Sequence, residues 1–401
     1  MVNLFEKYKG KHVLLLQGPM GPFFKRLSLD LIEAGANVYK INFNGGDWVF
    51  YPNSAINFSA GIEEWPDFLA DCFDRLKIDQ VILFGDCRAY HRDAISIAKL
   101  KSVPLFVFEE GYYRPDYVTF ESCGVSNNSK VSRNPNDFSD MAASDVKTPT
   151  GVGEHLLYVM LWSFIYYLFS ALLWPFFNSY RHHRNLKPNE ILYWLRSFYR
   201  KIYFMIAERN FMRDVVEKYT GDIFVVPLQV NVDSQILFHS HYASTRDFIR
   251  QTLLSFKQFS PNNTKLILKH HPLDRGYHNY SSYINRLVKE MKLAGRVFYV
   301  FEQSLPRLFL HARGAVVINS TSGLAAIDRG LPVKVCGNAI YSVAGLVYKG
   351  SVNNFWKRAH LFKVDRALYD RYKSHLILTT QINGNFYRRI KHSPYHCGFI
   401  L

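Results

Sequence analysis

Apolar residues in the first third of the chain gather into short runs that amphipathic stretches separate. Buried strands are expected at residues 12–17, 37–44, 79–85 and 103–111. The stretches 18–35 and 91–100 have helical spacing, and Gly35 marks the end of the first of these helices. Apolar strands that alternate with helices indicate a parallel sheet covered on both faces. No Gly-x-Gly-x-x-Gly pattern occurs, so a dinucleotide-binding fingerprint is not supported.

The same alternation returns in the second half, after a polar segment at 122–150 that we interpret as a loop or linker. Strands are expected at 221–229, 264–272, 296–302 and 331–337, helices at 244–259, 280–295 and 305–312, and a strand, turn and helix at 314–330. The pattern predicts two Rossmann-like α/β domains that face a central cleft. Open sheets of this kind bind ligands at the carboxyl ends of their strands.

Between the two halves lies a stretch, 155–180, without Asp, Glu, Lys or Arg. It is long enough to cross a bilayer, but a crossing would place the two halves on opposite sides of the membrane. We therefore expect it to lie along one leaflet, with Trp162 and Trp174 at the headgroups; the alternative is a buried helical hairpin. The aromatic and basic stretch 189–211 would suit an anionic lipid surface.

These patterns divide the chain into four parts. The expected boundaries are 1–150 for an N-terminal domain, 151–210 for an apolar helical insertion, 211–375 for a C-terminal domain, and 376–401 for a tail that packs back on the N-terminal domain.

The charge balance favours an anionic partner. The chain has 49 basic and 33 acidic residues, a formal net charge of +16, which fits nucleic acid, an anionic membrane or a phosphorylated substrate. Nucleic acid ranks last, because basic residues interleaved with aromatic ones occur only in the membrane-like segment. Five scattered cysteines without a Cys-x-x-Cys pair fit a reducing compartment. The first apolar stretch is too short for a signal peptide, so a cytoplasmic protein is expected.

Candidate chemistry begins with the paired acids Glu109 and Glu110 and the following Gly111, at the end of an apolar strand. A partly desolvated carboxylate has a raised pKa and can serve as a base. The alternative is an acidic start to a loop.

Two further groups follow strands of the second half. His271 ends one strand before Pro272 and can donate to a phosphate oxygen, with Lys269 and Arg275 adding positive charge. A metal is not expected there, because adjacent histidines on a strand face opposite ways. Asn319, Ser320, Thr321 and Ser322 lie between a strand and a helix, where hydroxyls cap the helix or, with its free N–H groups, bind an anion.

Other polar residues lie at the remaining strand ends. Gln229, Asp233 and Ser234 follow the first strand of the second half. In the first half the glycine-rich turn at 17–24 allows close approach of its backbone, and Arg88 can pair with a carboxylate or phosphate. Each of these residues has a structural alternative. The first-half residues are Gln17, Gly18, Gly21, Asn44, Asp47, Asp86, Arg88 and His91.

Taken together, these motifs resemble those of bacterial GT-B glycosyltransferases that use CMP-activated sugars. More closely, they resemble the capsule polysaccharide biosynthesis family of KpsS/LipB type over most of the chain. The stretches that carry the resemblance are QGPMGPFF, INFNGGD, GDCR, FEEGYYRPDY, HHPLDRG and INST.

The resemblance implies a retaining β-Kdo transferase that moves Kdo (3-deoxy-manno-octulosonate) from CMP-β-Kdo to a (lyso)phosphatidylglycerol lipid. This step starts the linker of a capsular polysaccharide at the cytoplasmic face of the inner membrane, where other capsule proteins are possible partners. No cofactor or metal is implied, and no Asp-x-Asp motif is present. The alternatives are a sialyltransferase-like enzyme and a non-catalytic capsule assembly or export subunit.

The resemblance also implies roles for individual residues. Asp233 is the expected nucleophile and Glu110 the expected base, with Glu109 as its alternate, and the two carboxyls would lie about 5 Å apart. The residues expected to bind the donor are His271, Pro272, Asn319, Ser320, Thr321, Lys269, Gln229 and Ser234, with Arg88 or Arg114 on the Kdo carboxylate.

Overall fold

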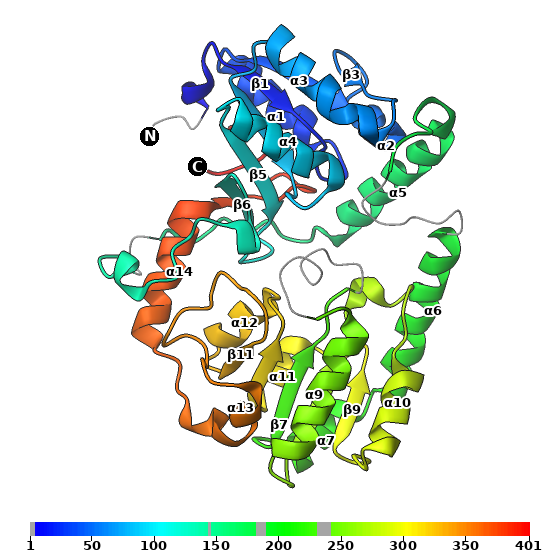
Figure 1. Cartoon of the computed structure of the whole chain (residues 1–401), viewed down its shortest axis with the longest axis vertical. Helices are drawn as coiled ribbons and strands as arrows, with labels where there is room; N and C mark the ends of the chain where they lie inside the picture. Colours follow the sequence, from blue (N-terminus) through cyan, green and yellow to red (C-terminus); the bar gives the residue numbers. More distant parts are fainter. Residues whose placement is uncertain (1–4, 143–145, 182–189, 231–241) are drawn as a thin grey trace. The chain divides into compact units, whose positions relative to one another are not determined.

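The computed structural model describes residues 5–142, 146–181, 190–230 and 242–401. Contacts divide the chain into two compact units, each with its own sheet (Figure 1). The first unit comprises Met1–Val131, Ser144–His183 and His375–Leu401, and the second comprises Ser132–Ala143 and Arg184–Ser374.

The first unit contains a seven-stranded sheet in the order β12-β6-β5-β4-β1-β2-β3. Strands β1 to β5 run parallel to one another. Strand β6 pairs antiparallel with β5, and β12 pairs antiparallel with β6. The four strands predicted from apolar runs are confirmed as β1, β2, β4 and β5. The strands are β1 His12–Leu15, β2 Asn37–Asn42, β3 Ile56–Asn57, β4 Gln80–Phe84, β5 Leu105–Glu110, β6 Tyr117–Ser122 and β12 Gln381–Asn383.

Helices cover both faces of this sheet because successive strand residues point to opposite sides. Val107 packs with α3 and α4, whereas Phe108 packs with α1 and the C-terminal residues. Helix α5 lies beside α2 (Figure 1). The helices are α1 Phe23–Glu33, α2 Gly45–Phe50, α3 Trp65–Arg75, α4 Ala89–Leu100 and α5 Leu156–Leu172.

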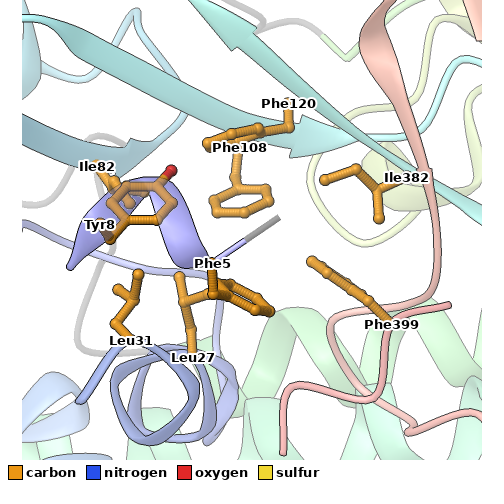
Figure 2. A pocket seen from close by; sticks show the side chains of 9 residues that line it. All are labelled: Phe5, Tyr8, Leu27, Leu31, Ile82, Phe108, Phe120, Ile382 and Phe399. Atoms are coloured by element: carbon orange, nitrogen blue, oxygen red, sulfur yellow. The ribbon is translucent and has the colours of Figure 1, made fainter. Parts of the chain in front are cut away.

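The C-terminal residues complete the first unit. Strand β12 pairs with β6, and the Phe386 ring lies 4.9 Å from the Phe23 ring, centroid to centroid. A small apolar pocket lies in this part of the core (Figure 2), and because aromatic and aliphatic side chains line it, we assign it no chemistry. Its lining residues are Phe5, Tyr8, Leu27, Leu31, Ile82, Phe108, Phe120, Ile382 and Phe399.

The second unit contains a five-stranded parallel sheet in the order β11-β10-β7-β8-β9. Its strands all match predicted apolar runs. They are β7 Ile223–Pro227, β8 Lys265–Lys269, β9 Val297–Val300, β10 Ala312–Val317 and β11 Val333–Val335.

Helices α9, α10 and α13 pack on one face of this second sheet. Residues 190–207 form α6 in this unit, and α14 includes the point at which the chain passes back to the first unit. Among the described residues, no helix combines the length and apolarity needed to cross a bilayer. The helices are α6 Glu190–Ala207, α7 Phe211–Lys218, α9 Thr245–Phe259, α10 Ser281–Glu290, α11 Leu305–Leu310, α12 Ser322–Asp328, α13 Val352–Arg358 and α14 Arg366–Thr380.

Candidate functional site

The strand ends of the first unit are joined by a side-chain hydrogen-bond network centred on Gln17. This residue follows β1 and is 4% exposed. Its Nε2 donates to Asp47 Oδ2 at 3.0 Å and to the Tyr180 hydroxyl at 2.9 Å. Its Oε1 accepts from Arg88 Nη1 at 2.8 Å. The carboxyl ends of β1, β2 and β4 therefore contribute to one polar cluster.

The side chains of Arg88 and Glu109 both lie next to Gly85. Arg88 Nη1 also donates to the Gly18 carbonyl at 3.3 Å, and its guanidinium lies 5.1 Å from the centre of the Phe84 ring. Gly85 has a φ of +75°, and a Cβ there would lie 3.5 Å from Glu109 Oε2 and 3.6 Å from Arg88 Nε. The carboxylate of Glu109 and the guanidinium of Arg88 consequently both approach the same glycine.

The environment of Glu109 favours its neutral form. Burial raises the pKa of the Glu109 carboxyl to about 7; the negative charges of Glu110 and Asp86 add to the effect, whereas the Glu110 N–H and Arg88 oppose it. A group with a pKa near 7 exists in both protonation states at neutral pH. Glu109 is therefore suited to accept a proton in a reaction.

Glu110 lies on the opposite face of the strand, because side chains alternate along β5. Its Oε1 accepts a hydrogen bond from the Tyr387 hydroxyl at 3.0 Å. Burial and the nearby Glu110 charge raise the pKa of that tyrosine well above its usual value. Gly111 is required for packing, since a Cβ there would overlap the Tyr117 carbonyl. Each residue of the Glu-Glu-Gly sequence thus has its own role: Glu109 titrates near neutral pH, Glu110 accepts a hydrogen bond from Tyr387, and Gly111 allows close packing.

Glycines of the first unit allow close packing. A Cβ on Gly18 would lie 2.8 Å from the Phe24 ring. Gly21 has a φ of +122° and faces the Trp162 ring. Asn44 caps α2, with its Oδ1 accepting from Asp47 N at 2.8 Å, so these residues begin a helix.

Three other candidate residues of the first unit, Arg114, His91 and Asp86, hydrogen-bond to backbone groups nearby. Arg114 is exposed, and its Nε donates to the Gly111 carbonyl at 3.1 Å. His91 is buried with Nδ1 2.7 Å from the Gly85 carbonyl oxygen, and burial lowers its pKa to about 3. Asp86 accepts from Val125 N at 3.0 Å. His91 and Asp86 therefore organise the loops around Arg88.

In the second unit, Gln229 and Asn319 connect the ends of β7 and β10. Gln229 Nε2 donates to Asn319 Oδ1 at 2.9 Å. Ser320 Oγ accepts from Ser322 N at 3.2 Å, whereas Thr321, the residue before α12, makes no side-chain cap. The predicted capping turn is present, and its hydroxyl contact comes from Ser320.

Lys269 and His270 are buried at the end of β8. Lys269 Nζ donates to the carbonyls of His270 at 2.7 Å and Phe301 at 2.5 Å, and burial lowers its pKa to about 8. His270 Nδ1 lies 2.6 Å from the Tyr299 hydroxyl, and burial lowers the pKa of His270 to about 3. The two carbonyls engage the Lys269 ammonium, whereas His270 Nε2 is buried without a hydrogen-bond partner among the described residues. A role for Lys269 in donor binding stays a prediction.

His271 is half-buried and begins the turn η7 (Pro272–Asp274). Its Nδ1 accepts from Leu273 N at 3.2 Å, so in the neutral ring the proton is on Nε2. Helix α6 supports the following loop through Arg200, whose Nη1 donates to the Arg275 carbonyl at 2.7 Å.

Sequence reasoning missed several residues that hold these strand ends. Tyr166 and Tyr180 come from the uncharged stretch, Tyr387 from the C-terminal tail and Arg200 from α6. No local pattern distinguishes them from other tyrosines and arginines, because their partners are far away in sequence.

Two predicted site residues, Asp233 and Ser234, fall at 231–241, outside the described residues. In the described part of the chain, the one group of three side chains with metal-ligand geometry is Asp30, Glu33 and His396. Asp30 already accepts from the backbone N–H of His396 and Cys397, at 2.6 and 2.7 Å. We therefore infer that these three residues hold the C-terminal tail in place.

The two Rossmann-like units, with polar residues at their strand ends, place the protein in the α/β class that includes GT-B glycosyltransferases. A family model described as "Capsule polysaccharide biosynthesis protein" matches residues 79–387, and the chain belongs to this family.

Individual relatives agree with this assignment. The chain is 36% identical to the capsule polysaccharide export protein KpsS of Escherichia coli, over 94% of this chain and 97% of that protein. It is 37% identical to the capsule polysaccharide modification protein LipB of Neisseria meningitidis serogroup A, over 97% of this chain and 94% of that protein. Among solved structures, KpsC of Thermosulfurimonas dismutans, titled beta Kdo 2,7 transferase, matches with a TM-score of 0.42 and 18% identity, over 86% of this chain and 92% of that chain.

Proposed function

We propose that this capsule polysaccharide biosynthesis protein is a glycosyltransferase that moves Kdo from CMP-β-Kdo to a (lyso)phosphatidylglycerol lipid. The observation that carries the proposal is the pair of Glu109 and Arg88 around Gly85, where a titratable carboxylate faces a positioned guanidinium. Family membership and the motif resemblance support the sugar and the acceptor class. No metal or other cofactor takes part in the proposed reaction.

The second unit is proposed to bind the CMP moiety. His271 Nε2 and the Ser320–Thr321 turn would donate to the phosphate, which gains negative charge as the bond to Kdo breaks. Gln229 and Asn319 support the proposal because their mutual hydrogen bond fixes the two strand ends beside this turn.

The proposed chemistry is a double displacement with retention. Asp233 attacks the anomeric carbon of Kdo, the bond between that carbon and the phosphate oxygen breaks, and CMP leaves. The lipid hydroxyl then attacks the Kdo–enzyme ester, its proton passes to the base, and the Asp233 carboxylate is regenerated. The two carboxyls would need to lie about 5 Å apart.

Glu109 is the better-supported base of the two acids. Its pKa of about 7 suits proton transfer, whereas Glu110 is engaged by the Tyr387 hydroxyl on the other face of β5. Within the described residues, the bonds of Arg88 use Nη1. We therefore propose its Nε–Nη2 edge for the Kdo carboxylate, with Arg114 as the alternative.

A lipid acceptor places the reaction at a membrane surface. We propose that the protein acts at the cytoplasmic face of the inner membrane, together with other capsule proteins, and that its net charge of +16 favours anionic lipid.

The direct test uses purified protein, CMP-Kdo and a fluorescent phosphatidylglycerol analogue. We expect a product whose mass equals the lipid plus Kdo, with the β configuration of the donor retained. CMP-sialic acid serves as the parallel donor. A product from CMP-sialic acid alone would establish a sialyltransferase, and an inverted anomeric centre would exclude the double displacement.

A second candidate is a non-catalytic subunit of capsule assembly or export, which the name "export protein" of the Escherichia coli relative favours. This candidate predicts no binding of CMP in titration calorimetry, and no effect of Glu109→Gln on capsule formation in cells.

A further inference from the structure

The outer side of α5 is an exposed apolar surface. Leu157 is 76% exposed, Phe164 56% and Leu172 61%, which is unusual for large apolar side chains on one helix face. We call this surface the outer stripe of α5; its residues recur at helical spacing and lie on one side. The outer stripe consists of Leu157, Met160, Leu161, Phe164, Leu168 and Leu172.

The inner side of α5 packs tightly on the first unit. A Cβ on Gly46 would lie 2.6 Å from both Ser170 Oγ and the Tyr166 ring, so α2 approaches α5 through a glycine. The alternative of a helical hairpin buried on all sides is therefore wrong for α5: one side is covered and the other is exposed.

Two inner side chains of α5 reach the strand-end residues. The Tyr166 hydroxyl accepts from Asn44 Nδ2 at 2.7 Å and from Gln17 Nε2 at 3.3 Å, and Gln17 in turn holds Arg88. Trp162 Nε1 donates to the Tyr387 carbonyl at 3.0 Å, and the hydroxyl of Tyr387 binds Glu110. The helix that carries the outer stripe is thus linked through Gln17 to Arg88 and through Tyr387 to Glu110.

The borders of the outer stripe match those of an anionic lipid surface. Tyr158 lies at one end with the Arg388 guanidinium 5.7 Å from its ring centre, and Trp174, 61% exposed, lies beyond the other end. Exposed Arg181 follows, and its Nη2 lies 3.2 Å from Oε1 of exposed Glu63. Aromatic rings and arginines at the ends of an apolar face suit the headgroup region, and residues 156–180 carry no acid that anionic lipid would repel.

We infer that α5 docks on the surface of an anionic phospholipid bilayer through the outer stripe, and that Tyr166 and Trp162 transmit this docking to the strand-end network as positioning residues. The link to a lipid acceptor rests on the proposed function, whereas the docking itself does not. Lipid contact on one side of α5 would then stabilise the arrangement of Gln17 and Arg88 on the other.

The docking is tested with the full chain and sedimented vesicles of phosphatidylcholine containing about one third phosphatidylglycerol. The triple variant Leu157→Ser, Leu161→Ser, Phe164→Ser should lose vesicle binding by about tenfold or more, because these side chains would enter the interface. The matched control is Leu310→Ser with Leu361→Ser, two other leucines that are each 69% exposed, and it should bind as the wild type does.

Three results would overturn the docking. The first is a triple variant that binds vesicles as tightly as the wild type. The second is loss of binding in a corresponding α6 variant (Leu195→Ser, Phe198→Ser, Ile202→Ser) in its place. The third is conversion of a wild-type dimer to a monomer by the triple variant without an effect on vesicle binding, which would assign the outer stripe to a second copy of the chain.

The positioning role is tested by hydrogen exchange, which needs no enzymatic activity. In the wild type, the vesicles should slow exchange of the α2 amides by about twofold or more. Tyr166→Phe keeps the ring but loses the hydroxyl, so it should bind vesicles normally while this slowing disappears. Slowing that persists in Tyr166→Phe would remove Tyr166 from the proposal.

The docking and the proposed function can be refuted separately. Vesicle binding through the outer stripe without Kdo transfer would refute the proposed function and leave the docking intact. Kdo transfer by a protein whose vesicle binding does not depend on the outer stripe would refute the docking and leave the proposed function intact.

Discussion

Burial shifts pKa values at the strand ends of both units, but in opposite directions. In the first unit an acid, Glu109, has its pKa raised to about 7 beside the guanidinium of Arg88. In the second unit two bases, Lys269 and His270, have their pKa values lowered to about 8 and about 3. In each case loss of water disfavours the charged form.

The two units differ in the groups that surround these titratable side chains. Glu109 lies beside Gly85 and Arg88, whereas Lys269 donates to two backbone carbonyls and His270 contacts Tyr299. In the first unit the titratable carboxylate is therefore next to a guanidinium, whereas in the second the ammonium is engaged by the backbone. Under the proposed function, proton transfer would belong to the first unit, and recognition of the donor in the second would be left to His271 and the Ser320 turn.

The largest expected effect tests the first half of this comparison. Glu109→Gln removes the proposed base and should lower kcat for Kdo transfer about 100- to 10,000-fold. Glu110→Gln is the matched control: its amide oxygen still accepts from Tyr387, and kcat should fall by less than about tenfold. Rates come from single-turnover assays with CMP-Kdo and the fluorescent lipid. A large loss in Glu110→Gln alone would exchange the roles of the two acids.

Lys269 tests the second half of this comparison, which concerns the buried bases of the second unit. Its folded-state pKa of about 8 is below the ordinary 10.5, so the unfolded chain binds more protons between these values and the stability of the protein rises with pH there. Lys269→Met should reduce this rise by about 1–3 kcal/mol in urea unfolding between pH 8 and 10.

The same variant should leave the KM for CMP-Kdo within about twofold. Exposed Lys289→Met is the control and should retain the whole rise in stability. A KM that increases tenfold in Lys269→Met would mean that this ammonium binds the donor after all.

Glu109 should produce the opposite dependence of stability on pH. Its pKa is raised, so its favourable contribution is complete below about pH 4.5 and is lost as the pH rises to about 7. Glu109→Gln should reduce this loss by about 1–2 kcal/mol. Glu121, whose pKa burial also raises to about 7, provides the comparison: Glu121→Gln should change the stability profile but leave the acidic limb of the rate profile near pH 7. A rate limb that moves in Glu121→Gln would contradict the assignment of Glu109.

Sequence patterns predicted the main sheet strands because these are short apolar runs with helices between them. They did not predict β6 and β12, since β12 joins residues 381–383 to 117–119, and such pairing has no local signal. The same limit applies to the site. Glu109, Arg88, Gln17 and His271 could be proposed from the sequence because they lie at or just after the ends of apolar strands, where ligands bind in α/β folds.

The residues that hold the site were beyond sequence reasoning. Tyr166 and Tyr387 are two of 26 tyrosines, and only the fold shows that they meet Gln17 and Glu110. The opposite directions of Glu109 and Glu110 follow from strand alternation, but which of them faces Arg88 required the structure.

The smallest expected effect concerns His271, which both caps a turn and is proposed to donate to the CMP phosphate. These roles can be separated, because Nδ1 accepts from Leu273 N whereas Nε2 would serve the donor. His271→Asn retains an acceptor suited to the cap but loses the imidazole. We expect stability close to that of the wild type and a KM for CMP-Kdo raised about three- to tenfold. His271→Ala, the comparison, should lose about 1 kcal/mol of stability in addition. An unchanged KM in His271→Asn would reduce His271 to its capping role and leave the Ser320 turn as the phosphate contact in the second unit.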